Sequence, residues 1–182
     1  KEHKGRELPP KDWAACGRHG RSHNNFVSSL LMDSASCEAH NRNLMKKYET
    51  IEQQEVRWEE IECDDAELII AAYGTTSRIA HSAVNHLRAA GKKVGLFRPI
   101  TIWPFPYKQL RKITSKRRVK AVLTVEMNGG QMVEDVRLAV NGRKPVEFHG
   151  RMGGEIPTVS DIEKISAIML EKYDHDDAEQ II

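Results

Sequence analysis

Cysteine is scarce in this 182-residue sequence, which contains only Cys16, Cys37 and Cys63. The three lie far apart and form no CxxC pair, which argues against an iron–sulfur or zinc site built by this chain alone. An odd, scattered set of cysteines is typical of a reducing compartment rather than of a disulfide-rich secreted domain. We therefore expect a cytoplasmic protein whose own residues hold no metal.

Long apolar runs are missing as well. No stretch approaches the roughly 18 residues that a membrane-spanning helix needs, and the first residues show no signal-peptide pattern. The formal net charge is only +2, so composition does not point to a nucleic acid or a membrane as partner. The one basic cluster, Lys116-Arg117-Arg118, has no interleaved aromatic residues and is typical of a solvated loop.

Familiar nucleotide and nucleophile motifs are also absent. The sequence has no GxGxxG, no GxxxxGK(S/T) and no GxSxG, and its eight histidines are dispersed. A dinucleotide fingerprint, a P-loop and a nucleophile elbow are therefore excluded. No carboxylate pair stands in a recognisable arrangement either, so no catalytic residue can be assigned.

The first third of the chain predicts an appendage rather than a core. The chain begins with Lys1 rather than Met, which favours a fragment or a processed product. Residues 1–33 are charged, carry Pro9-Pro10 and are expected to form an irregular linker or arm. Such an arm needs a surface to pack on.

Residues 34–62 predict a long amphipathic helix. We expect it to run from 36 to 61, with Ser34 or Ser36 as its cap. Its apolar side is a narrow stripe at helical spacing, made by Leu44, Tyr48, Ile51 and Trp58. One narrow stripe is typical of a helix that lies on a partner surface rather than in a core.

From residue 63 the pattern changes to strands alternating with helices. Four short apolar runs are typical of strands buried on both faces, AELIIAAY, KKVGLFR, VKAVLTVE and KPVEFHG. The alternation predicts a three-layer α/β domain over 63–173, with a mostly parallel sheet and helices on both faces. Residues 174–182 are acidic and predict a flexible tail.

Three glycine-bearing turns follow expected strands, where open parallel sheets gather their ligands. They are 74–77 (GTTS), 128–131 (NGGQ) and 150–154 (GRMGG). Their N–H groups favour an anion, but glycine equally suits a tight bend. We favour the bend, and predict positive φ at Gly129 or Gly130 with no phosphate bound there. The candidates for ligand or subunit contact are Gly74, Thr75, Arg98, Glu126, Asn128, Gly129, Gly130 and Gln131.

Two charged candidates end expected strands beside these turns. Glu126 directly precedes the second turn, and we expect its side chain to pin the loop backbone by hydrogen bonds. Arg98 precedes Pro99 and has three possible partners: Glu126 on a neighbouring strand end, an anionic ligand, or another subunit. We favour the pair with Glu126.

Longer strings, taken in order, resemble a known family. HNNFVSSLLMD, AELIIAAYGTTSRIAHSAVNHLRAAGKKVGLFRPITIWPFP and VEMNGGQMVEDVRLAVNGRKPVEFHGRMGGEIPT resemble the alpha subunit of 2-oxoacid:ferredoxin oxidoreductases. The likeness covers nearly the whole chain; the branched-chain (2-oxoisovalerate) type is nearest and the 2-oxoglutarate type second. The resemblance implies a domain similar to the transketolase C-terminal domain.

The resemblance also implies part of an enzyme. The family decarboxylates a 2-oxoacid on thiamine diphosphate with Mg²⁺, passes electrons through 4Fe–4S clusters to ferredoxin, and releases acyl-CoA. The implied partners are beta and gamma subunits and an N-terminal pyrimidine-binding domain, and a homodimer is possible.

The family's catalytic motifs are not found in this chain. Neither Tyr-Pro-Ile-Thr-Pro, nor Gly-Asp-Gly, nor the cluster cysteines occur, so none of the family's catalytic or cofactor-binding residues is placed on a position here. We expect a chain that is inactive alone and serves assembly. The alternative is an independent α/β module that binds a small molecule or nucleotide through its glycine turns.

Overall fold

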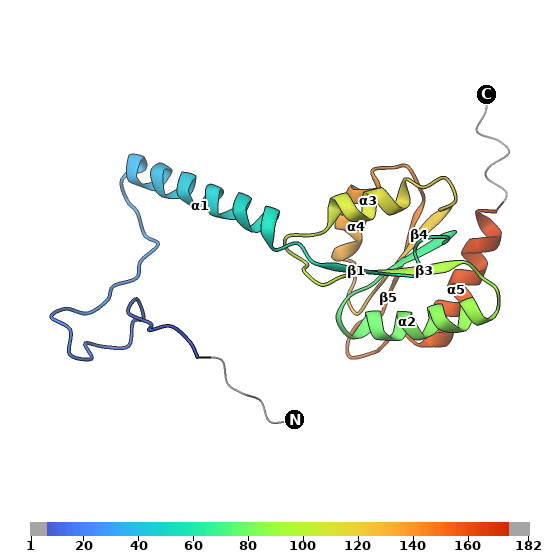
Figure 1. The fold of residues 1–182 in the computed structure, drawn as a ribbon, viewed down its shortest axis with the longest axis horizontal. Helices are drawn as coiled ribbons and strands as arrows, with labels where there is room; N and C mark the ends of the chain where they lie inside the picture. Colours follow the sequence, from blue (N-terminus) through green and yellow to red (C-terminus); the bar gives the residue numbers. More distant parts are fainter. Residues whose placement is uncertain (1–6, 175–182) are drawn as a thin grey trace. The chain divides into compact units, whose positions relative to one another are not determined.

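The computed structural model describes residues 7–174, which divide into two compact units between Lys46 and Lys47 (Figure 1). The first six residues of the predicted arm, and the predicted tail beyond Asp174, lie outside the described residues. Within this described part, no helix is both long enough and apolar enough to cross a membrane.

The first unit contains the arm and the beginning of helix α1 (Ser34–Gln54). Residues 7–33 form turns and bends without a helix or strand. Asp33 caps the helix in place of the expected serines, since its carboxylate accepts the Ser36 N–H at 2.8 Å. The same hydrogen bond lowers the pKa of Asp33. A carboxylate is favoured at this position because it complements the positive helix end.

The predicted helix over 36–61 is wrong at its C-terminal end. Helix α1 stops at Gln54, and Trp58–Ile61 instead form strand β1. β1 pairs antiparallel with strand β3 (Val94–Pro99), so that Trp58 lies opposite Pro99 and Ile61 opposite Leu96. The apolar periodicity of the sequence placed Trp58 in the helix. In the structure, the segment of Trp58 pairs instead with the edge of the sheet that would otherwise be open, because this pairing satisfies the backbone groups of that edge.

The second unit is an α/β fold built on a five-stranded sheet (Figure 1). The strand order is β1-β3-β2-β4-β5, with β1 antiparallel and the other four parallel. The mostly parallel sheet is confirmed, whereas its antiparallel edge strand was not predicted. After β1, the elements in chain order are β2 (Leu68–Ala71), α2 (Gly74–Ala89), β3 (Val94–Pro99), α3 (Tyr107–Thr114), β4 (Ala121–Glu126), α4 (Met132–Val140), β5 (Val146–Gly150) and α5 (Val159–Lys172).

Helices cover both faces of this sheet, as predicted. α3 and α4 pack on one face and α2 and α5 on the other (Figure 1). Successive strand residues point to opposite faces, so Ile69 and Val122 join the first core while Leu68 and Leu123 join the second. Burial on both faces explains why β2 is wholly apolar.

Helix ends follow the local signals in the sequence. Asn141 and Gly142 both adopt positive φ (52° and 71°) where α4 stops. Thr158 starts α5 with a reciprocal capping box, in which its side chain accepts the Asp161 N–H and Asp161 accepts the Thr158 N–H. These ends fix the lengths of the connections that carry the candidate site.

Candidate functional site

The winding of the sheet reverses between β2 and β4. β3 lies on one side of β2 and β4 on the other, and the connecting helices α2 and α3 cover opposite faces. Doubly wound sheets place ligands at such a switch point, beside the carboxyl ends of the strands. The loops 72–73, 100–106, 127–131 and 151–157 follow β2, β3, β4 and β5. Together we call them the carboxyl edge.

Glu126 occupies the centre of this edge. It ends β4, is fully buried, and directs both carboxylate oxygens at the start of α4. The backbone N–H groups of Met132 and Val133 each donate to it at 2.9 Å, and that of Gln131 donates at 3.3 Å. The amide of Asn128 adds a fourth hydrogen bond at 3.0 Å. The predicted role of Glu126 in pinning the loop is confirmed.

An external anion would have to displace this carboxylate. The first N–H groups of a helix are its anion-binding groups, and here they are already paired with a buried negative side chain. The α4 start is therefore satisfied from within the chain, and these contacts make the NGGQ turn a structural bend. That no phosphate binds there remains a prediction.

The turn itself is held by Asn128. Its side-chain oxygen accepts the Gly130 N–H at 2.7 Å, and its amide reaches the Tyr73 hydroxyl at 3.5 Å. Gly130 has a φ of +104°, which confirms the predicted positive φ, whereas Gly129 shows none. Asn128 thus connects the loop after β4 to the residue that begins the connection from β2 to α2.

Gly74 and Thr75 form the first turn of α2, across the switch point from Asn128. Gly74 has a φ of +55°, and its carbonyl accepts the Ser77 hydroxyl at 2.7 Å. The preceding residue, Tyr73, is in the N-cap position but makes no side-chain cap. The structure therefore links this turn to the NGGQ turn, through the contact between Tyr73 and Asn128, without adding a charged group.

The predicted Arg98–Glu126 pair is wrong. Arg98 instead forms an ion pair with Glu59 of β1, with Nη1 and Oε2 2.7 Å apart. β2 lies between β3 and β4, so the two strand ends were not neighbours. Glu59 could not be foreseen as the partner, because its segment was predicted to be helical.

The loop after β5 completes the edge. The Arg151 N–H donates to the Glu126 carbonyl at 3.1 Å, and the Arg151 side chain pairs with Glu155 at 2.7 Å. A Cβ added to Gly150 would collide with the backbone oxygen of Asn128, so the two loops touch. His149 is half-buried, and its Nε2 has no partner among the described residues.

A groove of about 630 Å³ opens beside the loop after β3. Its walls include Glu52 from the last turns of α1, and Trp103 and Tyr107 from the loop and α3. The Tyr107 hydroxyl donates to Asp135 of α4. Burial, and then this hydrogen bond, raise the pKa of Tyr107 to about 12. The phenol therefore stays protonated and joins α3 to α4.

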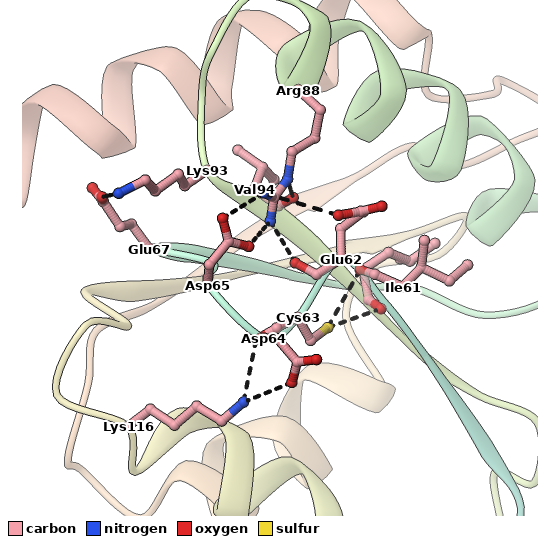
Figure 2. A network of polar contacts seen from close by, with 11 residues as sticks. Ile61, Glu62, Cys63, Asp64, Asp65, Glu67, Arg88, Lys93, Val94 and Lys116 are labelled. Carbon is pink, nitrogen blue, oxygen red and sulfur yellow. Dashed lines mark hydrogen bonds and ion pairs between the residues drawn. The ribbon is translucent and has the colours of Figure 1, made fainter.

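The opposite, amino edge of the sheet has a different chemistry (Figure 2). We define it by the loops 62–67, 90–93, 115–120 and 141–145. Arg88 donates to the Val94 carbonyl at 2.7 Å and pairs with Asp65 at 2.8 Å. Lys93 pairs with Glu67, and Lys116 with Asp64, each at 3.4 Å. This edge is a network of opposite charges.

Cys63 is buried within that network. Its sulfur lies 3.3 Å from the carbonyl oxygen of Leu96. It also lies 3.5 Å from that of Ile61 (Figure 2), so the thiol proton can be donated to either carbonyl. Burial raises the pKa of the thiol to about 12. Across residues 7–174, no three His, Cys, Asp or Glu side chains gather closely enough to hold a metal ion.

The topology and the switch point define a doubly wound α/β domain. Residues 66–162, more than half of the chain, match the family described as pyruvate:ferredoxin oxidoreductase core domain II. The chain belongs to this family. The predicted resemblance to 2-oxoacid:ferredoxin oxidoreductase subunits of the ketoisovalerate type is thereby confirmed.

Two groups of curated relatives extend the match beyond that domain. The ketoisovalerate oxidoreductase subunit VorB of Methanothermobacter marburgensis is 42% identical over 167 residues, which are 91% of this chain and 46% of the relative. The 2-oxoglutarate synthase subunit KorA of Methanocaldococcus jannaschii is 31% identical over 80% of this chain and 40% of its own length. The chain thus spans less than half the length of these relatives.

Solved structures share the fold. The 2-oxoglutarate:ferredoxin oxidoreductase from Magnetococcus marinus, solved with 2-oxoglutarate, coenzyme A and succinyl-CoA, aligns over 86% of this chain and 28% of that chain. Its TM-score is 0.64 at 19% identity. An inactive split-gene transketolase aligns over 64% of this chain and 42% of its own, with a TM-score of 0.52 and 21% identity. The predicted transketolase-like fold is confirmed.

Three residues at the carboxyl edge were missed from the sequence. Tyr73 and Arg151 contact the NGGQ loop and strand β4, and Glu59 neutralises Arg98. Tyr73 directly precedes Gly74, so its place at a strand end was a usable signal. The contacts of Glu59 and Arg151 depend on strand order, which periodicity does not encode.

Proposed function

We propose that this chain is the C-terminal part of the alpha subunit of a thiamine-diphosphate-dependent 2-oxoacid:ferredoxin oxidoreductase. The reaction of the whole enzyme is 2-oxoacid plus CoA plus oxidised ferredoxin to acyl-CoA, CO₂ and reduced ferredoxin, with a branched-chain 2-oxoacid as substrate. The observation that carries this proposal is the 42% identity to a ketoisovalerate oxidoreductase subunit over 91% of the chain. We place the complex in the cytoplasm.

The part assigned to this chain is structural. It supports the pyrimidine-binding domain and contacts the beta and gamma subunits, while ferredoxin and CoA meet the complex elsewhere. The start of α4 does not fit a diphosphate, because Glu126 already accepts its N–H groups. A 4Fe–4S cluster does not fit the cysteines either, since Cys63 is buried while Cys16 is exposed. The chain alone is therefore expected to be inactive.

Reconstitution tests the proposal. The chain is mixed with the remaining part of the alpha subunit and with the other subunits, and 2-oxoisovalerate-dependent reduction of a viologen dye is measured. We expect activity only when all components are present, with 2-oxoisovalerate preferred over 2-oxoglutarate and pyruvate. A mixture that is equally active without this chain would contradict the assembly role.

The alternative, an independent ligand-binding module, makes a different prediction. Calorimetry of the chain alone with coenzyme A, thiamine diphosphate or a nucleotide should then show tight binding. Gly130→Val should abolish that binding, because Gly130 has a φ of +104° that a β-branched residue rarely adopts. We expect no binding, since the buried Glu126 carboxylate takes the position of an anion.

A further inference from the structure

Large apolar side chains are exposed at one edge of the sheet and not at the other. The carboxyl edge exposes six of them, on the loops after β3, β4 and β5. We call them the edge patch; they are Ile100, Ile102, Trp103, Met127, Met152 and Ile156. Among the described residues, none of the exposed large apolar side chains falls in the amino-edge loops. Exposed apolar clusters of this kind mark interaction surfaces.

Hydrogen bonds and one side-chain contact link the loops that carry the patch. A Cβ on Gly129 would lie 3.4 Å from the sulfur of Met152, so Met152 lies against the NGGQ loop that Met127 begins. Asn128 in that loop reaches Tyr73 after β2, and the Ala72 N–H donates to the Phe97 carbonyl of β3 at 3.2 Å. Hydrogen bonds therefore connect the loops after β4 and β2 to the strand that leads to Ile100 and Ile102.

The charges around the patch are neutralised within the chain. Arg98 pairs with Glu59 and Arg151 with Glu155, both at 2.7 Å. The buried Glu126 is paired with backbone N–H groups. A surface with paired charges and exposed apolar side chains complements a neutral apolar protein surface rather than an anionic ligand.

We propose that the edge patch docks on the part of the oxidoreductase subunit that this chain does not span. This inference rests on the proposed function and specifies which face of the domain makes the contact. The length of the relatives supports this choice of partner, because the residues that match this chain make up only 46% of the VorB subunit and 40% of KorA. That part of the subunit presents a neutral apolar surface of its own to the loops after β3, β4 and β5.

Two equally exposed apolar residues provide a matched test. Met152 in the edge patch and Ile168 on the outer face of α5 are both 62% exposed. The tagged 182-residue chain, Met152→Asp and Ile168→Asp are titrated with the remaining part of the subunit, expressed separately, and Kd is measured. We expect Met152→Asp to raise Kd at least tenfold, because a buried unpaired carboxylate is costly. Ile168→Asp should leave Kd within about twofold.

Each outcome has a separate meaning. Melting temperatures of both variants close to that of the parent chain show that any loss of binding is not loss of folding. Equal binding by the parent chain and Met152→Asp, or equal losses of binding in both variants, overturns the docking role of the edge patch but leaves the proposed function standing. No binding of the parent chain to any part of the oxidoreductase overturns the proposed function as well. Self-association that Met152→Asp abolishes would make a second copy the occupant, and would overturn the occupant named here.

Discussion

The two edges of the sheet differ in how their charged side chains are paired. At the amino edge, Arg88 and Asp65 belong to a network of ion pairs (Figure 2) whose aspartate side chains are open to solvent. At the carboxyl edge, Glu126 is buried and paired with backbone N–H groups, while methionine and isoleucine side chains are exposed. At the carboxyl edge, the chain's own Glu126 carboxylate therefore occupies the helix start where folds of this kind commonly bind an anion, and the proposed protein contact uses the apolar side chains around it.

The largest expected effect concerns the reactivity of the buried thiol at the amino edge, compared with an exposed thiol in the N-terminal arm. Cys63 at the amino edge has a pKa raised from 9.0 to about 12 by burial, which lowers its thiolate population about a thousandfold. Iodoacetamide at pH 8 should therefore modify the exposed Cys16 and leave Cys63 unmodified until the chain is unfolded in urea. Mass spectrometry of the peptides measures both rates. Equal rates in the native chain would show that the amino edge opens readily.

Removal of the buried carboxylate should give the largest loss of stability. Glu126→Ala leaves the buried N–H groups of Met132 and Val133 without an acceptor, at a cost of about 3 kcal/mol or more. Glu126→Gln keeps one acceptor oxygen and should lose about half as much. Urea unfolding of the parent chain and of the two variants measures these losses in the free energy of unfolding.

Glu134 provides the control for that series. Its side chain lies in the same first turn of α4, is 70% exposed, and pairs with Arg137. Glu134→Gln should change the free energy of unfolding by less than about 0.5 kcal/mol. A comparable loss in this variant would attribute the effect to the helix dipole rather than to the buried hydrogen bonds.

The fold was largely predictable from the sequence because its signals are local. The run AELIIAAY gave a strand buried on both faces, and Asn141-Gly142 gave a helix end. Strand order is not local, so the partner of Arg98 and the pairing of Trp58–Ile61 with β3 were missed. Glu126 lay between these cases, since the hydrogen bonds of its side chain reach no more than seven residues along the chain. Its role was therefore predictable, whereas the surface formed by the loops around it was not.

Two neighbouring glycine positions test how closely the loops of the carboxyl edge pack. Gly150→Ala would place a Cβ against the Asn128 backbone oxygen and the Phe148 ring, which requires a backbone shift and should cost about 2 kcal/mol. Gly129→Ala would meet only the flexible Met152 side chain, at 3.4 Å, and should be nearly neutral. Thermal unfolding compares the two. Similar melting temperatures would mean that the contact between the loops after β4 and β5 is loose.

The smallest expected effect is the pH dependence of the amino edge. The hydrogen bond from Arg88 lowers the pKa of Asp65 below its ordinary value of 3.8, so the ionised carboxylate stabilises the folded chain. This contribution is present above pH 4 and is lost as the pH falls through the lowered pKa.

The stability difference between the parent chain and Asp65→Asn should therefore be constant from pH 7 to about 5 and shrink below pH 4. Salt at 1 M should reduce this difference, because the Asp65 side chain is 54% exposed. In an Arg88→Met background, Asp65→Asn should have no such dependence. A difference that persists without Arg88 would assign the effect to the loop of Asp65 itself, and would weaken the contrast between a charge-paired amino edge and an apolar carboxyl edge.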